Sequence, residues 1–392
     1  MGSGDGKVRE CEAPRIWRLL FSITASIFVA FVDSACAYDD FSVKGYCKNL
    51  LSVSENASSE SILSDLNRVR LELRGKINSR LSGKLILDNE LWTGNVLKTE
   101  AFRQQKDAPR LTFFDHGLTV ADNSGVFNRL LTHRAFLSFD YGSGSVVAGQ
   151  QRIAWGTAKL WNPTDLFNPY NPITLERDER LGVDAIRLEQ VIGPLSKAVA
   201  AYAPGAISSK SSGAAKYMTH LHGYDLSVMG GIFHDRVAVG GDFAGSIKDV
   251  GIHGEGVVAF DEKSEIQPGF VVGGEYAFPN SFYFLVEYYY NGAGKADSRD
   301  YETARLLVGE IVSLGRHYLG GLAGYDFSGV LRGEFYGIYN ITDGSAFLQA
   351  LLRYSLLTNL DWSIGSQVFV GNSAGEYGAP HKFYYTQVQW YF

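Results

Sequence analysis

The stretch that decides the fold is RVRLELRGKIN, from Arg68 to Asn78. Apolar residues or glycine stand at positions 69, 71, 73, 75 and 77, and charged or amide side chains occupy the positions between them. Successive side chains of a β-strand point to opposite faces, so this stretch predicts a strand with one apolar and one charged face. The segments around 81–88 and 131–141 repeat the alternation.

The rest of the chain follows the same rhythm. Its 392 residues include 44 Gly, 22 Tyr and 24 Phe but only 10 Pro and 3 Met, a composition that suits strands and tight turns. We predict about 18 strands, with 16 as the alternative, because single-chain bacterial barrels have even strand numbers. The predicted spans are 41–53, 67–78, 80–92, 129–141, 144–155, 183–192, 195–203, 216–222, 224–234, 236–246, 251–260, 266–278, 282–291, 316–326, 329–341, 345–356, 359–370 and 382–392.

A soluble β-sandwich would alternate in the same way, with its apolar side facing a core. Three features favour a membrane barrel instead. Aromatic residues cluster at segment ends, as in 276–290; short and long connections alternate; and the chain ends on an aromatic strand at 382–392. Beyond the N-terminus no stretch reaches 18 apolar residues, and a closed barrel is the other way to span a bilayer. The sequence therefore predicts an all-β fold, a transmembrane antiparallel β-barrel over 38–392.

The N-terminus predicts export. Arg15 and Arg18 precede an uncharged run of 14 residues over 19–32, and Ala35-Cys36-Ala37 matches a small-x-small cleavage site. We expect a signal peptide over 1–37, cleaved near Ala37, and a mature protein in the outer membrane of a Gram-negative bacterium. A retained N-terminal anchor and a lipoprotein cut before Cys36 are the alternatives.

The densest functional candidate is GQQRIAWGTAKLWNPTDLFNPYNP, over 149–172, which contains three Asn-Pro pairs. Proline fixes its own φ and restricts the residue before it, so these pairs impose a stiff, extended path. We predict that the connection 156–182 folds into the barrel and narrows the pore; the alternative is a rigid loop that only stabilises the wall. The pore candidates are Arg152, Trp155, Asn162, Asp165, Asn168 and Arg177.

Charged residues on the polar strand faces predict a wet lumen, because a barrel of this size leaves room for water. The lumen candidates are Arg70, Arg74, Lys84, Arg134, Glu287, Arg332 and Glu334. Charges of both signs would select hydrated polar solutes, or they would pair across neighbouring strands, and both can hold together.

Other function classes lack a sequence signal. The net charge of −6, without a basic stripe, argues against nucleic acid, and no GxSxG or comparable nucleophile motif supports an enzyme. His220 and His222, with His234 and His253 further along, lack the partners that would complete a metal site, so we expect no metal and no cofactor. Glycine pairs such as Gly273-Gly274 and Gly320-Gly321 do not open a helix after a strand, so they suit crowded strands better than phosphate loops.

Several runs together resemble a group of poorly characterised porin-like outer-membrane proteins. They are GQQRIAWG…NPTDLFNP, YNITDGSAFLQALLRYSL, GSQVFVGNSAGEYG and the final QVQWYF, and the resemblance extends from about Phe41 to Phe392. It implies an outer-membrane location and passage of a solute, and it assigns no binding residue. The terminal strand ending at Phe392 also resembles the assembly signal of such barrels, which implies the barrel-assembly machinery as a partner.

Together these observations predict a porin-like channel for passive diffusion of small polar or ionic solutes, surrounded by outer-membrane lipid. Two alternatives remain open at this stage. The barrel could be a structural sleeve around a periplasmic partner such as a cytochrome, or its outer loops could form an adhesin or receptor surface. The sequence specifies neither the solute nor the oligomeric state.

Overall fold

The computed structural model describes residues 40–55, 60–107, 113–114, 116–169, 171–175, 181–205, 211–260, 266–303, 306, 311–378 and 382–392. The predicted signal peptide over 1–37 and the pore candidate Arg177 lie outside the described residues. Within the described part of the chain, no helix is long and apolar enough to cross a membrane.

The described residues form one antiparallel sheet of nineteen strands, β1 to β19. β1 pairs with β2 on one side and with β19 on the other, so the first and last strands close the sheet into a barrel. The strands are β1 (Phe41–Glu55), β2 (Ser61–Lys76), β3 (Leu81–Thr93), β4 (Gly117–Asp122), β5 (Val126–Asp140), β6 (Gly144–Gln151), β7 (Val183–Gly193), β8 (Ser196–Ala203), β9 (Ser212–Leu221), β10 (Tyr224–Phe233), β11 (Arg236–Ile247), β12 (Val250–Phe260), β13 (Ile266–Ala277), β14 (Phe282–Asn291), β15 (His317–Ser328), β16 (Leu331–Asn340), β17 (Ser345–Leu357), β18 (Leu360–Val370) and β19 (Lys382–Tyr391).

Eighteen of these strands form the closed wall, which confirms the predicted number. β4 is the additional one. It pairs with the start of β5, whereas β3 pairs with β5 directly and continues the wall. Beside β4, the connection from β3 to β5 holds two short helices that the sequence did not predict, η1 (Asn95–Lys98) and α2 (Glu100–Asp107).

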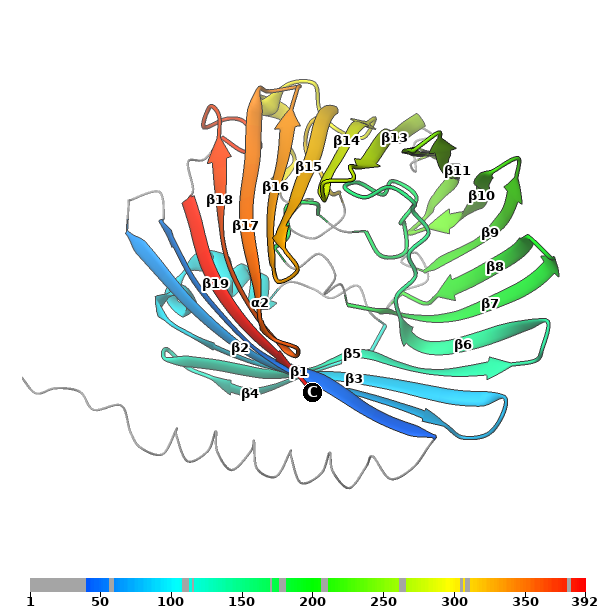
Figure 1. Cartoon of the computed structure of the whole chain (residues 1–392), viewed down its shortest axis with the longest axis horizontal. Coiled ribbons are helices and arrows are strands. Elements are labelled where there is room, and N and C mark those ends of the chain that lie inside the picture. The colour runs from blue at the N-terminus through cyan, green and yellow to red at the C-terminus, as the bar shows by residue number, and fades with distance from the viewer. Residues whose placement is uncertain are drawn as a thin grey trace, which may run out of the picture.

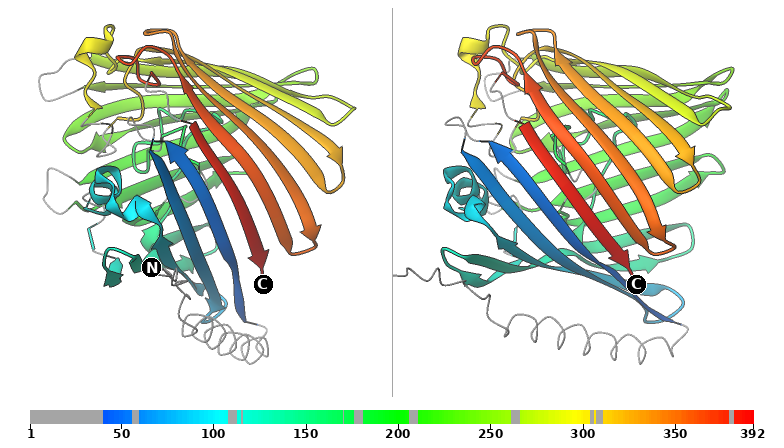
Figure 2. Two further views of the ribbon diagram at one scale, coloured as in Figure 1. Left: turned by 90° about the vertical axis from the view of Figure 1, so that its left-hand side faces the viewer. Right: turned by 60° about the vertical axis from the view of Figure 1, so that its left-hand side comes forward.

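Because consecutive wall strands are antiparallel, the connections lie alternately at the two ends of the barrel. The turns that follow β2, β5, β7, β9 and β11 are short, and they lie at the same end as the C-terminus because every strand reverses direction. The long connections after β3, β6, β14 and β18 lie at the opposite end, which is the outer end in a barrel of this kind. Figure 2 shows α2 and the short helix η3 (Ser298–Asp300) at that end, away from the C-terminus.

Strand β14 illustrates how the two faces divide. Phe284 and Val286 point outward with 44% and 37% of their surface exposed, whereas Leu285 and Glu287 point inward and are almost fully buried. Other strands expose large apolar residues on the same outer face, among them Ile186, Val228, Phe335 and Ile364. Exposure of so much apolar surface to water would be unfavourable, whereas contact with lipid chains is what the outer face of a membrane barrel requires.

The charged faces of the early strands turn inward and pair. Arg68 of β2 contacts Glu90 of β3 at 2.7 Å, and Arg129 of β5 approaches the other oxygen of the same carboxylate, also at 2.7 Å. Next to them Arg70 donates to Asp88 at 2.6 Å. Cross-strand pairing of the inner charges, one of the two possibilities that the sequence left open, is therefore present in this part of the wall.

A bulge in β5 changes the predicted faces. Ile86 of β3 pairs with Arg134 while the next residue, Leu87, pairs with Thr132, so His133 is inserted between them. Strict alternation would place Leu131 on the outer face with Ala135, but the bulge turns Leu131 inward, where only 4% of it is exposed. A single inserted residue leaves no sign in a period-two pattern, so the prediction for Leu131 was wrong.

Candidate functional site

The candidate site begins where the chain leaves the wall. β6 ends at Gln151, four residues earlier than predicted, and the wall resumes when Val183 of β7 pairs with Gln151. Between them lies the connection 152–182, called the inward loop below, and its described residues run inside the ring of strands (Figure 1). This agrees with the prediction that the connection folds into the barrel.

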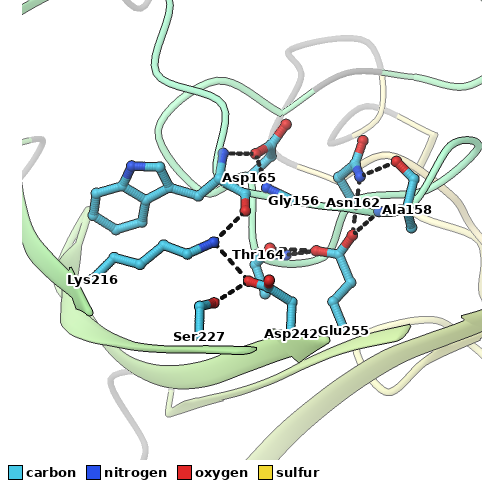
Figure 3. Close-up of polar contacts among 10 residues, drawn as sticks. Gly156, Ala158, Asn162, Thr164, Asp165, Lys216, Ser227, Asp242 and Glu255 are labelled. Atoms are coloured by element: carbon cyan, nitrogen blue, oxygen red, sulfur yellow. Dashed lines mark hydrogen bonds and ion pairs between the residues drawn. The ribbon is translucent and has the colours of Figure 1, made fainter. Parts of the chain in front are cut away.

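The entry to the inward loop is fixed by one carboxylate and one ammonium group (Figure 3). Asp165 accepts hydrogen bonds from the backbone N–H groups of Trp155 and Gly156, the latter at 2.8 Å. The Trp155 carbonyl accepts from Lys216 of β9, and the Lys216 ammonium lies 2.6 Å from Asp242 of β11. These bonds tie both sides of the first corner of the loop to each other and to the wall.

Glu255 of β12 fastens the middle of the loop (Figure 3). Its two oxygens accept from the Ala158 N–H at 3.0 Å, the Asn162 side-chain amide at 2.9 Å and the Thr164 N–H at 3.1 Å, and the Thr164 hydroxyl donates as well. Glu255 is only 5% exposed. A buried carboxylate needs several donors, and here the loop provides two from its backbone and two from its side chains.

Glu287 of β14 holds the tip of the loop in the same way. It accepts from the backbone N–H groups of Lys159 at 2.7 Å, Leu160 at 3.1 Å and Trp161 at 3.4 Å. His253 of β12 lies 2.8 Å from the first of its oxygens. Glu255 and Glu287 together, called the carboxylate clamp below, therefore fix the path of residues 158–164.

Two glycines make room for this clamp. Gly273 lies on β13 between His253 and Glu287, and a Cβ there would come within 2.8 Å of His253 Nε2 and 2.5 Å of Glu287 Cγ. Gly320 pairs with Glu287 from the other side, and a Cβ there would lie 2.6 Å from the Trp161 ring. The sequence indicated that such glycines relieve crowding, and here the crowding group is the tip of the inward loop.

Gly320→Ala is expected to lift the tip of the loop from its seat, since Trp161 is buried and stacked on Tyr289 and cannot yield easily. Overpacking of this kind costs about 1–3 kcal/mol. We expect a lower temperature of heat modification on gel electrophoresis than for Gly256→Ala, the matched control, whose Cβ would meet its nearest neighbour at 3.6 Å. Equal stability of the two variants would show that the tip does not rest on Gly320.

Apolar packing completes the seat of the loop. Leu160 and Trp161 join a buried cluster with Leu285, Tyr318 and Phe347 on the inner wall. A second cluster joins Ile153, Trp155 and Phe167 of the loop to Val199 and Phe233, among other residues. The loop thus packs against inner-face residues that are spread over the strands from β7 to β17.

Most of the predicted pore residues hold the inward loop in place and do not line the lumen. Trp155 is 8% exposed and packs on Phe167, and Asp165 is 3% exposed. Asn162 bonds to the Ala158 carbonyl and Glu255, and Asn168 donates to the Leu181 carbonyl at 3.0 Å. These four residues shape and fasten the loop rather than face the lumen. Arg152 is half-buried at the point where the chain leaves β6.

The predicted lumen charges all point inward, but most are engaged. Arg70 bonds to Asp88; Lys84 lies 3.3 Å from Glu72, which also contacts Arg74; and Arg332 contacts Glu334 at 2.7 Å and Asp326 at 2.8 Å. Arg134, the residue after the bulge in β5, pairs with Ile86 and lies on the inner face. Glu287 is completely covered by the loop, so it serves the clamp and not the open lumen.

Lys159 is a lumen residue that the sequence reasoning missed. Its backbone is held by Glu287, yet half of its side chain (52%) is exposed, and its ammonium group lies 3.9 Å from Glu275 of β13. The available signal was its place in the motif: it is the only charged residue between Arg152 and Asp165. The clamp therefore presents one cation on the tip of the loop.

The four histidines that were weighed as metal ligands do not form one cluster. His220 contacts Asp225 near the short-turn end; His222 lies in the turn after β9; His234 lies in the outer turn after β10; and His253 belongs to the clamp. Among the described residues, no group of three or more His, Cys, Asp or Glu side chains could hold a metal ion.

This geometry defines a class. A closed antiparallel barrel of eighteen strands, with an apolar outer face, short turns at one end and a loop folded into its interior, is an outer-membrane β-barrel of the porin type. The fold indicates the outer membrane of a Gram-negative bacterium as the location of the chain.

Solved structures with the same fold are outer-membrane proteins at very low sequence identity. OprD of Pseudomonas aeruginosa matches with a TM-score of 0.59 and 10% identity, over 90% of this chain and 95% of that one. OccAB4 of Acinetobacter baumannii matches with a TM-score of 0.58 and 9% identity, over 91% and 99%. OccK8 (OprE) of P. aeruginosa gives 0.55 and 10%, over 90% and 98%. Comparisons with protein-family models and with curated proteins find no match.

Proposed function

We propose that the chain is a diffusion channel that filters small polar or ionic solutes at the inward loop. The observation that carries this proposal is the carboxylate clamp. It fixes a loop across part of the interior while a charged tip residue, Lys159, remains half exposed. A loop that served only stability would need no water-exposed cation at its tip.

The rest of the inner wall supports a wet pathway. The side chain of Arg74 on β2 is 56% exposed and that of Arg332 on β16 is 33% exposed. Each of them contacts a carboxylate of the inner face. Charged walls favour hydrated solutes over apolar ones, and a fixed loop selects by size and charge. The fold shared with outer-membrane proteins such as OprD agrees with a channel.

Of the two alternatives, the sleeve is disfavoured by the same observation. A sleeve around a periplasmic partner would leave its interior to the partner, whereas here the chain's own loop occupies part of the interior and packs against strands from β7 to β17. The receptor alternative predicts binding through the outer loops and makes no use of the clamp.

Liposome swelling tests the proposal. Vesicles that contain the refolded protein should swell in iso-osmotic solutions of small sugars, amino acids and organic anions, with rates that fall steeply as solute size increases. Vesicles that contain folded barrel and do not swell in any of these solutes would reject a diffusion channel.

Lys159→Gln is expected to lower the permeability of anions relative to cations, and Lys159→Glu to lower it further, because one charge beside the pathway changes the local ion concentration. We expect the permeability ratio of chloride to potassium to fall about twofold or more for each step of charge. The ratio is read from the reversal potential across a KCl gradient. The matched control is Lys248→Gln, which removes one positive charge from the short turn after β11 and should leave the permeability ratio unchanged. Equal ratios for all variants would remove Lys159 from the pathway.

A further inference from the structure

Three outer connections meet above β15–β18, away from the inward loop's own clamp. They are the connection 292–316, the turn 341–344 and the connection 371–381. A set of polar residues joins them, called the outer cluster below: Tyr301, Tyr318, Asn340, Asp343 and Glu376. The clamp carboxylates are not part of this cluster, although the Tyr318 ring also packs against Trp161 of the inward loop.

Glu376 is its centre. One of its carboxylate oxygens accepts from the Leu314 N–H at 3.1 Å, and the other accepts from the Asn340 amide at 2.9 Å and from the Tyr318 hydroxyl. Tyr318 and Asn340 are fully buried, so this carboxylate reaches into the interior although the residue itself is partly exposed.

A second carboxylate lies in the same cluster. Asp343 accepts from the Tyr301 hydroxyl at 2.8 Å, from the Asn340 amide at 3.0 Å and from the backbone N–H of Glu376 at 2.8 Å. The Asn340 amide therefore donates to both acids. Among the described basic side chains of the same connection, Lys295 lies 3.1 Å from Glu302, Arg299 pairs with Asp297, and Arg316 donates to the Gly294 carbonyl.

The residue after Glu376 anchors the connection to the inner wall. Tyr377 is 3% exposed and packs against Phe347 and Phe369, in the same apolar cluster that seats Leu160 and Trp161 of the inward loop. The connection after β18 thus rests on the interior through Tyr377, and Glu376 holds it there.

We propose that the outer cluster is a pH-sensitive latch, which holds the connection after β18 folded into the mouth at acidic pH and releases it as the pH rises. The groups that face the Glu376 carboxylate are Tyr318 of β15, Asp343 of the turn, Tyr301 of the connection after β14 and its own neighbour Tyr377. None of them is a cation. Ionised Glu376 and Asp343 then face each other without a counter-charge among the described residues.

The direction of the effect follows from the acid. Burial, with the charge of Asp343 as a further cause, raises the pKa of Glu376 from its ordinary 4.5 to about 7. An acid whose pKa is raised in the closed state favours that state fully below pH 4.5, and the advantage is lost as the pH rises through about 7. The closed latch is therefore the state of acidic solution.

Single-channel recording in EDTA at pH 5 and pH 8 tests the latch. In the wild-type channel the ratio of time spent in the released state to time spent in the latched state should rise by up to about a hundredfold from pH 5 to pH 8, since each of the two pH units between pH 5 and about 7 changes the equilibrium up to tenfold. Glu376→Gln keeps an acceptor and removes the titration, so its switching should not depend on pH. Glu302→Gln, an exposed acid of the same region, should behave like the wild type. A flat wild-type profile, or a Glu376→Gln profile that rises equally, would overturn the proposal.

Asp343→Asn gives a second test that does not depend on the folding of the Glu376 variant. Removing the Asp343 charge lowers the pKa of Glu376, so the transition should move to lower pH, and an unmoved transition would contradict the latch. The conductance readout rests on the proposed channel function. Chymotrypsin cleavage after Tyr377 supplies a separate readout, which should accelerate between pH 5 and pH 8 in the wild type relative to Glu376→Gln. A folded barrel without conductance would reject the channel, while the cleavage rates would still decide on the latch.

Discussion

Replacing both acids of the carboxylate clamp with alanine, Glu255→Ala with Glu287→Ala, is expected to free the inward loop and raise the single-channel conductance. The two carboxylates accept eight hydrogen bonds, seven of them from residues 158–164. Each backbone donor left without its acceptor in a buried site costs about 1–3 kcal/mol, so the loop should leave its seat and not stay there unpaired. A wider path should raise conductance about twofold or more.

The matched control for the clamp is Glu189→Ala, which removes an inner-wall acid whose carboxylate contacts Lys197 and makes no hydrogen bond to the described residues of the loop. It should keep the wild-type conductance. If the double clamp variant folds and conducts as the wild type does, the loop either does not narrow the pathway or is held by apolar packing alone.

Arg68→Leu is expected to produce the largest loss of stability in the wall. Arg68 and Glu90 are both almost fully buried, and Glu90 lies between Arg68 and Arg129. Removing one partner of a buried ion pair typically costs about 3–5 kcal/mol, because the remaining charge is left partly uncompensated. Urea unfolding in detergent, followed by tryptophan fluorescence, measures the loss.

Arg74→Leu provides the comparison for Arg68→Leu. Arg74 lies on the same inner face of β2 but is 56% exposed, and exposed pairs contribute about 1 kcal/mol or less. A midpoint for Arg68→Leu no lower than that for Arg74→Leu would mean that the inner charges of this wall are well solvated and not buried pairs.

Most of the wall could be predicted because its signal is local. Alternation, terminal aromatics and turn residues lie within each strand, and all eighteen wall strands fall on the predicted segments. The largest differences have physical causes. β2 begins at Ser61 and not at 67, because residues 61–66 continue the pairing with Leu50 to Glu55 of β1. β4 and α2 lie in the polar connection 94–125, where the sequence shows no clear strand or helix pattern. The bulge at His133 inserts one residue, and no residue type in the sequence indicates it.

The candidate site was less accessible to sequence reasoning. The Asn-Pro pairs indicated a stiff loop inside the barrel, but they could not show what holds it. The clamp joins the Ala158 backbone to Glu255, 97 residues away, and the Lys159 backbone to Glu287, 128 residues away. Backbone donors carry no residue signature, so nothing in the motif identified these partners. The same reasoning explains why Asn162 and Asp165 looked like pore residues although they fasten the loop.

The central claim is that the chain is a water-filled channel narrowed by its inward loop. The most direct test is the single-channel conductance of the refolded chain from Tyr38 to Phe392 in a planar bilayer. The account predicts steady, ion-selective steps that grow in the double clamp variant. A heat-modifiable, folded barrel that carries no current in either form would contradict it and would favour the sleeve or the receptor alternative.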